Sequence, residues 1–512
     1  MDLSPVDWSS HIAGFLQRPV DAIAASDGSG GQLSYRDLAH RAYGLALALQ
    51  QRGLSAGQSV AHCLPNSLDA IWVAYGLKLA GVADTPLAWG STTDELKWCL
   101  SLAKAEWVIS LRSRADALQV LGVRLICIED LLENLEEIRN DQVERVFESC
   151  PAVPGDTPGR ILFTSGTTGR PKAVLYSHAR RWQGERMQLE QQPFAPASGD
   201  RLLLMTPFIH GASLLTFAWL AAGAEVVLLD GVDLPVVDRL FATSALSAVF
   251  APPTVLAKLT RAWPQRRVPD VRCVFTGTQP LTQGLYRQAR DLFGPVVRIT
   301  YGKTECINPI TVLTPEQTED FFQTPSDEPG ACVGWPAPGV ELRIDPDTTE
   351  VWLRAPQMSL GFLDSNGLRP HEPDGWHATG DLGAWDRAGR LRLTGRVADV
   401  IKTGGYRVNP DEIEACLSSL SEAPVLCITS LPSDYWGEVI IAVCEREGDE
   451  WRTRVEQACE PLSRHKRPRL FVQLSSLPRN AQGKVSRRAV REAVLQAHDL
   501  IDGPYPRLQA KG

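Results

Sequence analysis

Residues 164–172 read TSGTTGRPK and directly follow the stretch RILF at residues 160–163. These nine residues contain four hydroxyl side chains, two glycines and one lysine. A loop of this composition presents backbone N–H groups, hydroxyl donors and a lysine cation, and the anions that need so many donors are mostly phosphates. The stretch is not a Walker A loop, because its glycines are three apart and Pro171 precedes the lysine. It predicts a phosphate-binding loop, and nucleotide binding has to be argued from the rest of the chain.

Length and composition limit the class of protein. A chain of 512 residues is too long for one hydrophobic core, so we expect two or more domains. Its 44% hydrophobic and 22% charged residues are typical of a soluble globular protein. The formal net charge of -8 argues against nucleic-acid binding as the main function.

Targeting and metal signals are missing from the sequence pattern. No apolar stretch reaches the roughly 20 residues that span a bilayer, and the N-terminus lacks a basic region followed by an apolar run. The 11 cysteines are scattered and never form CxxC. We therefore expect a cytoplasmic protein with reduced thiols, no membrane span and no cysteine-bound metal.

Helix-like and strand-like segments alternate along the chain, which is typical of α/β architecture. Apolar residues at helical spacing predict a helix over residues 34–53. Three segments are expected to be buried strands that lead into loops, with a helix over 281–294 between the last two: 248–259, 271–277 and 296–302.

The composition and the predicted elements of the sequence change towards the C-terminus. Short, glycine-rich and charged β segments begin near Gly361, and a stretch with its own helices follows Asn409. We expect a large N-terminal domain of α/β sheets with a small β-rich subdomain, residues 1–397. A small, mobile C-terminal α+β domain would comprise residues 398–512.

Three loops rich in glycine and hydroxyl residues follow predicted strands. They are the loop at residues 164–169, the residues 277–279 and the residues 301–302. Ligands of open α/β sheets bind beyond the carboxyl ends of the strands, so the three loops are expected to line one crevice.

The third loop continues as YGKTE and places Thr304 beside Glu305. A carboxylate close to a phosphate-binding loop is repulsive unless a cation lies between them. Mg²⁺ fits, since it is usually held by one or two carboxylates and substrate phosphates. The alternative is that Glu305 is an exposed acid at the start of a loop, and these five residues alone leave both open.

Five motifs, in this order and at this spacing, resemble the adenylate-forming superfamily: TSGTTGRPK (164–172), YGKTE (301–305), HATGD (377–381), GRVADVIKTGGYRVNPDEIE (395–414) and PRNAQGKVSRR (478–488). Members of that superfamily include acyl-CoA synthetases, adenylation domains of peptide synthetases and beetle luciferases. The similarity extends over nearly the whole chain and is closest in pattern to acyl-CoA ligases.

The resemblance implies an ATP site and a bound Mg²⁺. Six residues would wrap the β- and γ-phosphates, with Lys172 nearby: Thr164, Ser165, Gly166, Thr167, Thr168 and Gly169. The adenine site would be formed by Gly277, Thr278 and Gln279, with Tyr301 stacking on the base beside Gly302. Thr304 would bond the α-phosphate and Glu305 would hold Mg²⁺, while Asp381 and Arg396 would reach the ribose.

The implied reaction explains why these residue types are needed. A carboxylate attacks the α-phosphate of ATP and pyrophosphate leaves, so both reactants are anionic and the barrier is largely electrostatic. Lys484 resembles the lysine that the small domain delivers to the active site, where a cation neutralises charge in the transition state. No general base is required, because a carboxylic acid is already ionised at pH 7.

Family members then make a thioester after the small domain rotates. By resemblance, Gly404 and Gly405 would line a tunnel for the thiol, and Lys402 matches a lysine assigned to this second conformation. The basic run at residues 464–469, which includes Lys466, would meet the phosphates of coenzyme A, with Trp436 stacking on its adenine. The alternative for the run is a solvated helix end. Ala398 stands at the hinge position, where relatives usually have Asp or Lys.

The acyl pocket is the least defined part of the sequence. His210, in FIHG, would border the carboxylate of the substrate. Phe208 occupies the position at which domains for α-amino acids carry an aspartate, so such a substrate is not expected. Lining residues by resemblance also include Gly211, Phe250, Thr276, Thr300, Ile307 and Asn308. They suggest an aryl, alicyclic or medium-chain acid.

Three functions remain open from the sequence. The first is an ATP-dependent acyl-CoA ligase. The second is an acyl-AMP ligase that loads a carrier protein instead of coenzyme A. The third is a non-catalytic binding protein of the same fold, against which the intact phosphate loop, Glu305 and Lys484 argue.

Overall fold

The computed structural model describes residues 4–136, 150–164, 171–243, 246–324, 328–417, 425–445, 450–479 and 485–511. The chain has an α/β fold and divides into two compact units. The first unit comprises Met1–Pro325, Val333–Glu341 and Arg354–His377, and the second comprises Ser326–Cys332, Leu342–Leu353 and Ala378–Gly512. The boundary predicted at residues 397/398 lies within the second unit and stays a prediction.

The first unit contains an eight-stranded sheet that carries the strand of the phosphate loop. Strands β7, β4, β3, β5 and β6 are parallel, whereas β8, β18 and β19 extend the sheet in antiparallel fashion. In spatial order the strands are β19 (Gly367–Pro370), β18 (Gly361–Asp364), β8 (Lys172–Ser177), β7 (Pro158–Thr164), β4 (Ala83–Leu87), β3 (Ser59–Cys63), β5 (Trp107–Ser110) and β6 (Arg124–Cys127).

The second sheet of this unit carries the other two predicted loops. Six consecutive strands of this sheet pair with one another in parallel, namely β1, β10, β9, β11, β12 and β13. The spatial order is β2 (Gln32–Ser34), β1 (Ile23–Ser26), β10 (Glu225–Leu228), β9 (Arg201–Leu204), β11 (Ala248–Phe250), β12 (Cys273–Gly277), β13 (Val297–Lys303), β14 (Cys306–Leu313) and β15 (Ala331–Pro336). All five residues of β12 are buried, as expected for a central parallel strand covered on both faces.

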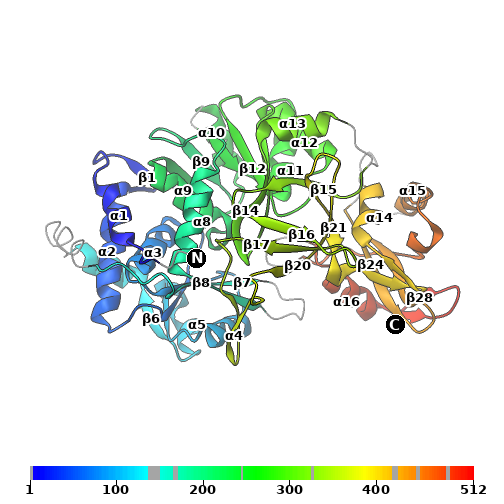
Figure 1. Ribbon diagram of the computed structural model, residues 1–512, viewed down its shortest axis with the longest axis horizontal. Coiled ribbons are helices and arrows are strands. Elements are labelled where there is room, and N and C mark those ends of the chain that lie inside the picture. The colour runs from blue at the N-terminus through cyan, green and yellow to red at the C-terminus, as the bar shows by residue number, and fades with distance from the viewer. Residues whose placement is uncertain are drawn as a thin grey trace. The chain divides into compact units, whose positions relative to one another are not determined.

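Helices cover these sheets, and α8 contacts strands of both of them. Figure 1 shows α8 and α9 between β9 and β8. The helices of the first unit are α1 (Trp8–Leu16), α2 (Tyr35–Gln51), α3 (Leu68–Leu79), α4 (Thr93–Ala103), α5 (Ala115–Gln119), α6 (Ile128–Glu136), α8 (His178–Glu190), α9 (Ser213–Ala222), α10 (Leu234–Ala242), α11 (Pro253–Ala262), α12 (Gln283–Phe293) and α13 (Pro315–Gln323). Short helical turns are η1 (Arg112–Arg114) and η2 (Phe208–Ala212).

Two sequence-based helices are confirmed and one strand prediction is partly wrong. Helix α2 has its N-cap at Ser34, whose side chain accepts from the Asp37 N–H, and Gly53 follows it with a left-handed φ of 76°. Helix α12 also lies where it was expected. In the segment 248–259, only β11 is a strand, because Pro253 occupies the first turn of α11, where its fixed φ and missing N–H favour a helix start.

The second unit contains a four-stranded ladder and a five-stranded sheet. The ladder has the order β16 (Glu341–Ile344), β17 (Glu350–Arg354), β20 (His377–Trp385) and β21 (Leu391–Arg396). The five-stranded sheet has β23 (Tyr406–Val408), β22 (Ile401–Thr403), β25 (Gly437–Cys444) and β24 (Leu426–Ser433), with β26 (Leu470–Gln473) paired to β25. Its helices and turns are η3 (Val397–Asp399), α14 (Pro410–Leu417), α15 (Glu450–Ala458), η4 (Arg464–Lys466) and α16 (Arg487–Ala497).

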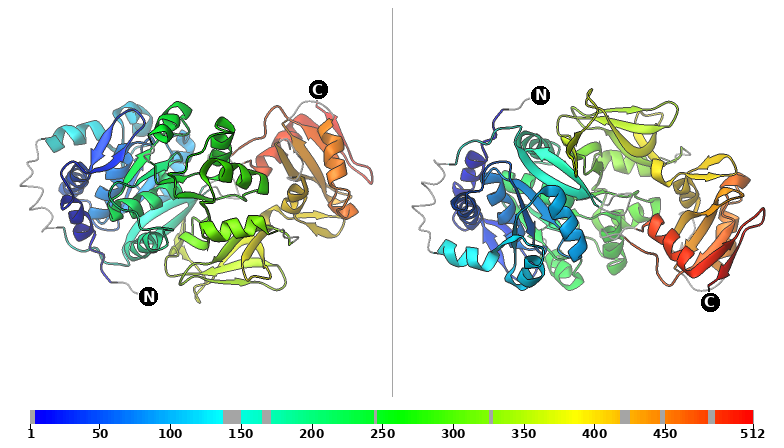
Figure 2. Two further views of the ribbon diagram at one scale, coloured as in Figure 1. Left: turned by 90° about the horizontal axis from the view of Figure 1, so that it is seen from above. Right: turned by 90° about the horizontal axis from the view of Figure 1, so that it is seen from below.

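A C-terminal hairpin completes this unit. Strands β27 (His498–Ile501) and β28 (Arg507–Ala510) follow α16 and are drawn in red in Figure 2. All 11 cysteines are free thiols, as predicted. Among the helices that the structure describes, none combines the length and the apolar character needed to cross a bilayer.

Candidate functional site

The predicted phosphate loop connects β7 to β8. Thr164 ends β7 and pairs with Lys172, the first residue of β8, so the two ends of the loop lie side by side. The indole N–H of Trp98, in α4, donates to the Pro171 carbonyl oxygen at 2.9 Å and fixes the outgoing end. Ser165, Gly166, Thr167, Thr168 and Gly169 lie outside the described residues, so their role stays a prediction.

The predicted adenine wall is built where β12 and β13 approach each other closely. A Cβ atom on Gly277 would lie 2.4 Å from the Thr300 carbonyl oxygen, so only glycine fits this position. Thr278 follows with a φ of 70°, a left-handed conformation that is uncommon for a residue other than glycine. Strained residues of this kind cluster at ligand sites, which supports the assignment of this loop to binding.

The turn that carries Thr304 and Glu305 is held by two groups from outside its own sheet. The hydroxyl of Tyr176, at the end of β8, donates to the Thr304 carbonyl oxygen at 2.6 Å. The Ser359 N–H donates to the Glu305 carbonyl oxygen at 2.9 Å. Because β8 is the neighbour of β7, the structure brings the predicted Mg²⁺ ligand to the sheet that bears the phosphate loop.

Sequence reasoning missed both supporting residues. Tyr176 is 1% exposed and stands in an apolar strand, where a tyrosine predicts only a core residue. Ser359 is also buried, and its hydroxyl lies 2.7 Å from Nε2 of His371. Burial lowers the pKa of His371 to about 4, so this histidine is neutral at pH 7.

The motif FIHG forms the π-helical turn η2, and irregular turns of this kind frequently mark functional sites. Asn66 fixes its start: Oδ1 accepts from the Phe208 N–H at 2.7 Å, and Nδ2 donates to the carbonyl oxygens of Thr206 and Leu229. Asn66 is a third residue that the sequence did not reveal. Phe208 is buried in the core with its ring edge against Phe217. The His210 side chain lies outside the described part of the structure.

The other predicted acyl residues of the first unit pack against glycines. A Cβ on Gly211 would lie 3.4 Å from the ring of Phe250, which places this ring beside η2. A Cβ on Gly184, in α8, would lie 2.6 Å from Ile307. Ile307 therefore fills the space that a side chain at position 184 would occupy.

Polar groups lie on the neighbouring strands. Asn308 covers Gly302, since a Cβ there would lie 1.5 Å from the Asn308 Oδ1. The Thr300 hydroxyl donates to the Thr276 carbonyl oxygen at 3.5 Å. Thr276 directly precedes Gly277 in β12, and successive residues of a strand point to opposite faces of the sheet. The Thr276 side chain therefore projects from the face opposite to that of Gly277. Its Oγ1 is buried with no hydrogen-bond partner among the residues that the structure describes.

The two predicted ribose ligands are neighbours in the second unit. Asp381 and Arg396 are directly opposite on β20 and β21, and Arg396 Nε lies 3.0 Å from Asp381 Oδ1. The preceding Gly380 N–H donates to the Glu350 carboxylate at 2.9 Å. Asp381 is buried, whereas Arg396 is exposed, so the pair presents one buried acceptor and one exposed donor.

The predicted thiol tunnel forms the turn between β22 and β23. Gly404 and Gly405 both have positive φ values, 56° and 83°, which explains why two glycines are needed. Lys402 is exposed, and its backbone N–H donates to the Glu438 carboxylate at 2.7 Å. Trp436 lies against Gly404, and the Arg469 guanidinium sits 3.8 Å from the centre of its ring. One face of this indole is therefore covered by a cation.

The basic run is partly engaged within the unit. Lys466 Nζ lies 2.5 Å from the Glu412 carboxylate, and Arg467 donates to the Leu462 carbonyl oxygen at 2.8 Å. His465 stacks on Tyr406 with ring centres 4.0 Å apart. The run thus contacts the residue that follows the turn at 404–405. The assignment of Lys466 to coenzyme A stays a prediction.

The predicted hinge lies in η3, where Ala398 is followed by Asp399. Arg487 donates to the Asp399 carboxylate at 2.7 Å and also pairs with Asp411 and Glu414. Lys484, the predicted catalytic lysine, lies outside the described residues. Within the described ranges, no group of three or more His, Cys, Asp or Glu side chains is arranged to hold a metal ion.

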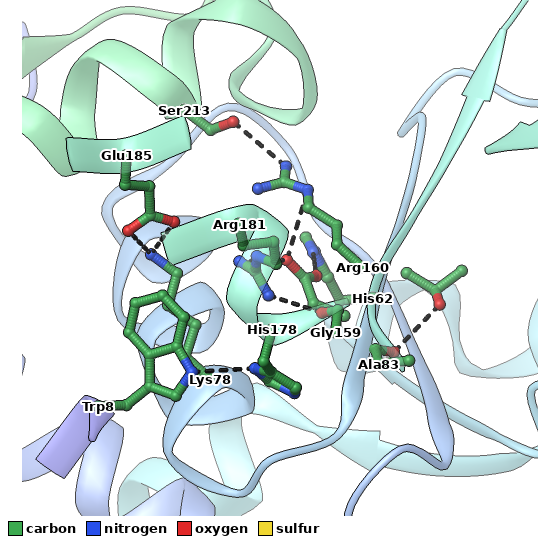
Figure 3. Close-up of polar contacts among 12 residues, drawn as sticks. Trp8, His62, Lys78, Ala83, Gly159, Arg160, His178, Arg181, Glu185 and Ser213 are labelled. Atoms are coloured by element: carbon green, nitrogen blue, oxygen red, sulfur yellow. Dashed lines mark hydrogen bonds and ion pairs between the residues drawn. The ribbon is translucent and has the colours of Figure 1, made fainter. Parts of the chain in front are cut away.

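A network of buried charges lies among β7, α8 and α9 (Figure 3). Arg160 of β7 donates to the Ser213 hydroxyl at 3.2 Å and lies 3.7 Å from Asp84, while Arg181 of α8 lies 3.4 Å from Asp84. Burial raises the pKa of Asp84, but Arg160 and the hydrogen bond from His62 outweigh it and hold this pKa well below its usual range. The network therefore links the strand of the phosphate loop to the helix that follows η2.

A second pair of charges is buried next to it. Lys78 Nζ lies 2.7 Å from the Glu185 carboxylate and 3.3 Å from the centre of the Phe217 ring. Lys78 is 0% exposed. Figure 3 also shows Trp8, whose indole N–H donates to Nδ1 of His178 at 2.9 Å.

Comparison with known proteins identifies the family. The family model described as AMP-binding enzyme matches residues 14–363. Over 530 residues the chain is 28% identical to the 4-chlorobenzoate–CoA ligase of an Arthrobacter species, which covers 98% of this chain and 96% of the relative. It is 26% identical to the 2-succinylbenzoate–CoA ligase of Geobacillus sp. (strain WCH70), covering 93% and 95%.

A solved structure shares the fold over nearly the whole length. The o-succinylbenzoate CoA synthetase of Bacillus subtilis, in complex with its acyl-adenylate intermediate, superposes with a TM-score of 0.80 at 22% identity. The match covers 96% of this chain and 99% of that one. Because the family model spans more than half of the sequence, the chain belongs to the AMP-binding enzyme family.

Proposed function

We propose that the chain is an ATP-dependent acyl-CoA ligase. It would convert a carboxylic acid to acyl-AMP with release of pyrophosphate and then transfer the acyl group to the thiol of coenzyme A. The observation that carries the proposal is the turn at Thr304 and Glu305, which Tyr176 ties to the sheet of the phosphate loop. The relatives named as CoA ligases, aligned over nearly the full length, support the choice of reaction.

Each unit carries candidate residues for binding the nucleotide. In the first unit, Gly277 and Thr278, the second with an unusual φ of 70°, would line the adenine ring. In the second unit, the buried Asp381 carboxylate is suited to accept from ribose hydroxyls, with Arg396 beside it. Fixed carboxylates of this kind recognise ribose in other nucleotide sites.

The chemistry of the donor set fits Mg²⁺. Glu305 supplies a hard carboxylate oxygen, its backbone is fixed through Ser359, and Thr304 supplies a hydroxyl next to it. When bound, Mg²⁺ would supply positive charge against the phosphates. The chain itself would bind and orient the triphosphate with the loop at 164–172, and Lys484 would add a cation at the reacting phosphate.

The acid would bind beside η2. Phe250 lies beside Gly211 and Ile307 lies beside Gly184, and these two side chains would form an apolar wall of the pocket, to which Thr300 and Asn308 would add polar groups. This wall favours an aryl, alicyclic or medium-chain acid. Phe208 points into the core instead of offering a carboxylate, which argues against an α-amino acid.

The acceptor thiol would reach the adenylate along the turn at Gly404 and Gly405, and the basic run around Lys466 would face the phosphates of coenzyme A. The second candidate is a carrier protein as acceptor. The exposed Tyr406, which stacks on His465 of the basic run, favours it as part of an alternative surface for an acidic partner. The third candidate is a non-catalytic binding protein of the same fold.

The test is pyrophosphate release with ATP and Mg²⁺ over a panel of aryl, alicyclic and straight-chain acids, with and without coenzyme A. We expect an acid whose turnover requires coenzyme A and yields its thioester. Release of about one equivalent that stalls with and without coenzyme A would overturn the acceptor and favour a carrier protein. No release with any acid would overturn the enzyme activity. The Lys484→Ala variant should lose adenylation while still converting pre-made acyl-AMP.

A further inference from the structure

The C-terminal hairpin holds the loop between β24 and β25. The Asp502 carboxylate accepts from the Ser433 hydroxyl at 2.6 Å, from the Asp434 N–H at 2.6 Å and from the Tyr435 N–H at 3.1 Å. Next to it, the Gly503 carbonyl oxygen accepts from the indole N–H of Trp436 at 3.0 Å. Four consecutive residues of this loop are therefore bonded to two residues of the hairpin.

The same loop supports the turn between β22 and β23. The Gly404 N–H donates to the Trp436 carbonyl oxygen at 2.8 Å, and Thr403 pairs with Gly437. A Cβ on Gly404 would lie 3.2 Å from Cε3 and Cζ3 of Trp436, so the indole lies in contact with the backbone of this turn. The position of Trp436 thus sets the space beside Gly404.

Two successive sets of contacts connect the hairpin to the turn at Gly404. Asp502 orders residues 433–436, and Trp436 in turn abuts Gly404. A carboxylate that accepts several bonds, two of them from backbone N–H groups, is a strong local anchor, because charge-assisted hydrogen bonds are about twice as strong as neutral ones. The bond from Ser433 is the largest cause that lowers the pKa of Asp502, so the anchor stays ionised at neutral pH.

We propose that Asp502 is a positioning residue for thioester formation, acting through Trp436 on the turn at Gly404 and Gly405. The inference rests on the proposed function, which assigns this turn to the acceptor thiol. Asp502 would act through Trp436 and would not touch the reacting groups. Its loss should therefore affect the second half-reaction and leave adenylation almost unchanged.

The matched pair of variants is Asp502→Ala and Asp499→Ala. Asp499 lies on the same hairpin, where it pairs with Lys511 at 3.3 Å, so both variants remove one carboxylate from one element. Three quantities are measured on the full chain: pyrophosphate release without thiol, the rate and KM of thioester formation from pre-made acyl-AMP with coenzyme A, and amide hydrogen exchange of residues 433–436.

For Asp502→Ala we expect thioester formation to fall about tenfold, because displaced groups near a reacting centre cost rate steeply, with adenylation within about twofold of wild type. Exchange at residues 433–436 should accelerate. Asp499→Ala should match wild type in all three measurements. Trp436→Ala should reproduce the thioester defect, and its combination with Asp502→Ala should add little, since both act on one contact.

Three results would overturn the inference. They are an unchanged thioester rate in Asp502→Ala, an equal loss in both half-reactions, and unchanged exchange at residues 433–436. Wild-type activity with coenzyme A tests the proposed function separately from Asp502. A wild-type chain that forms acyl-AMP but no thioester would overturn the acceptor, whereas a changed ratio of variant to wild type reports only on Asp502.

Discussion

The hydroxyl of Tyr176 donates a hydrogen bond of 2.6 Å to the Thr304 carbonyl oxygen and so joins the two sheets of the first unit at the candidate site. The donor stands on β8 and the acceptor follows β13. This bond ties the turn that bears Glu305 to the strand that follows the phosphate loop, although the two residues that it joins are more than one hundred positions apart in the sequence.

Removing this bond should reduce adenylation. Tyr176→Phe deletes one buried hydrogen bond, worth about 1 kcal/mol, so we expect a loss of about fivefold in pyrophosphate release. Tyr43→Phe is the control, because Tyr43 is buried in the same unit and its hydroxyl bonds Ser9. Equal effects of the two variants on rate would contradict a role of Tyr176 in placing Thr304.

The acyl pocket should respond to a methyl group on α8. A Cβ at Gly184 would lie 2.6 Å from Ile307, so Gly184→Ala must displace this side chain at a cost of about 1–3 kcal/mol. We expect a shift of kcat/KM toward smaller acids, measured over the acid panel. Gly284→Ala, in α12, has nothing within 4 Å of the new atom and should leave the acid preference unchanged. An unaltered preference in Gly184→Ala would remove Ile307 from the pocket.

The buried Lys78–Glu185 pair should be costly to break. Lys78→Met leaves the Glu185 carboxylate buried without its partner, and we expect a loss of about 3–5 kcal/mol in the free energy of unfolding, measured in urea. Arg186→Met, also on α8, breaks an exposed pair with Glu190 and should cost less than about 1 kcal/mol. Adding Glu185→Leu to Lys78→Met should recover stability. A small cost of Lys78→Met by itself would show that the pair contributes little.

His178 should make the fold sensitive to acid. Burial lowers the pKa of His178 from 6.5 to about 3, so the folded state favours the neutral ring. Below pH 6.5 the unfolded state binds more protons at this residue, and the free energy of unfolding falls as the pH is lowered towards 3, by at most about 1.4 kcal/mol per pH unit.

The measurement is urea unfolding between pH 7 and pH 4. We expect a flatter pH dependence in His178→Gln, since a glutamine can accept from Trp8 and donate to the Gly81 carbonyl oxygen without titrating. The half-buried His498 provides the control variant His498→Gln. Identical slopes for wild type and His178→Gln would mean that another group governs acid unfolding.

The sequence predicted the parts of the site that depend on local chemistry. A loop that must offer many donors needs glycines and hydroxyls close together, and a turn with two left-handed residues needs two glycines, so TSGTTG and Gly404–Gly405 can be read directly. The order of five such motifs indicated the family, and the family model agrees. The alternation of strands and helices indicated the α/β fold, apart from the segment after β11.

Tertiary structure decided which groups hold these parts in place. Tyr176, Asn66 and Ser359 each bond a backbone group of a segment distant in the sequence, and their residue types have no spacing that reveals the partner. The same holds for the buried charges around Asp84, because lysines and arginines in a sequence predict solvated residues until packing removes the water. Local chemistry limits which residues a loop can use, whereas long-range hydrogen bonds and buried ion pairs exist only once the chain has folded.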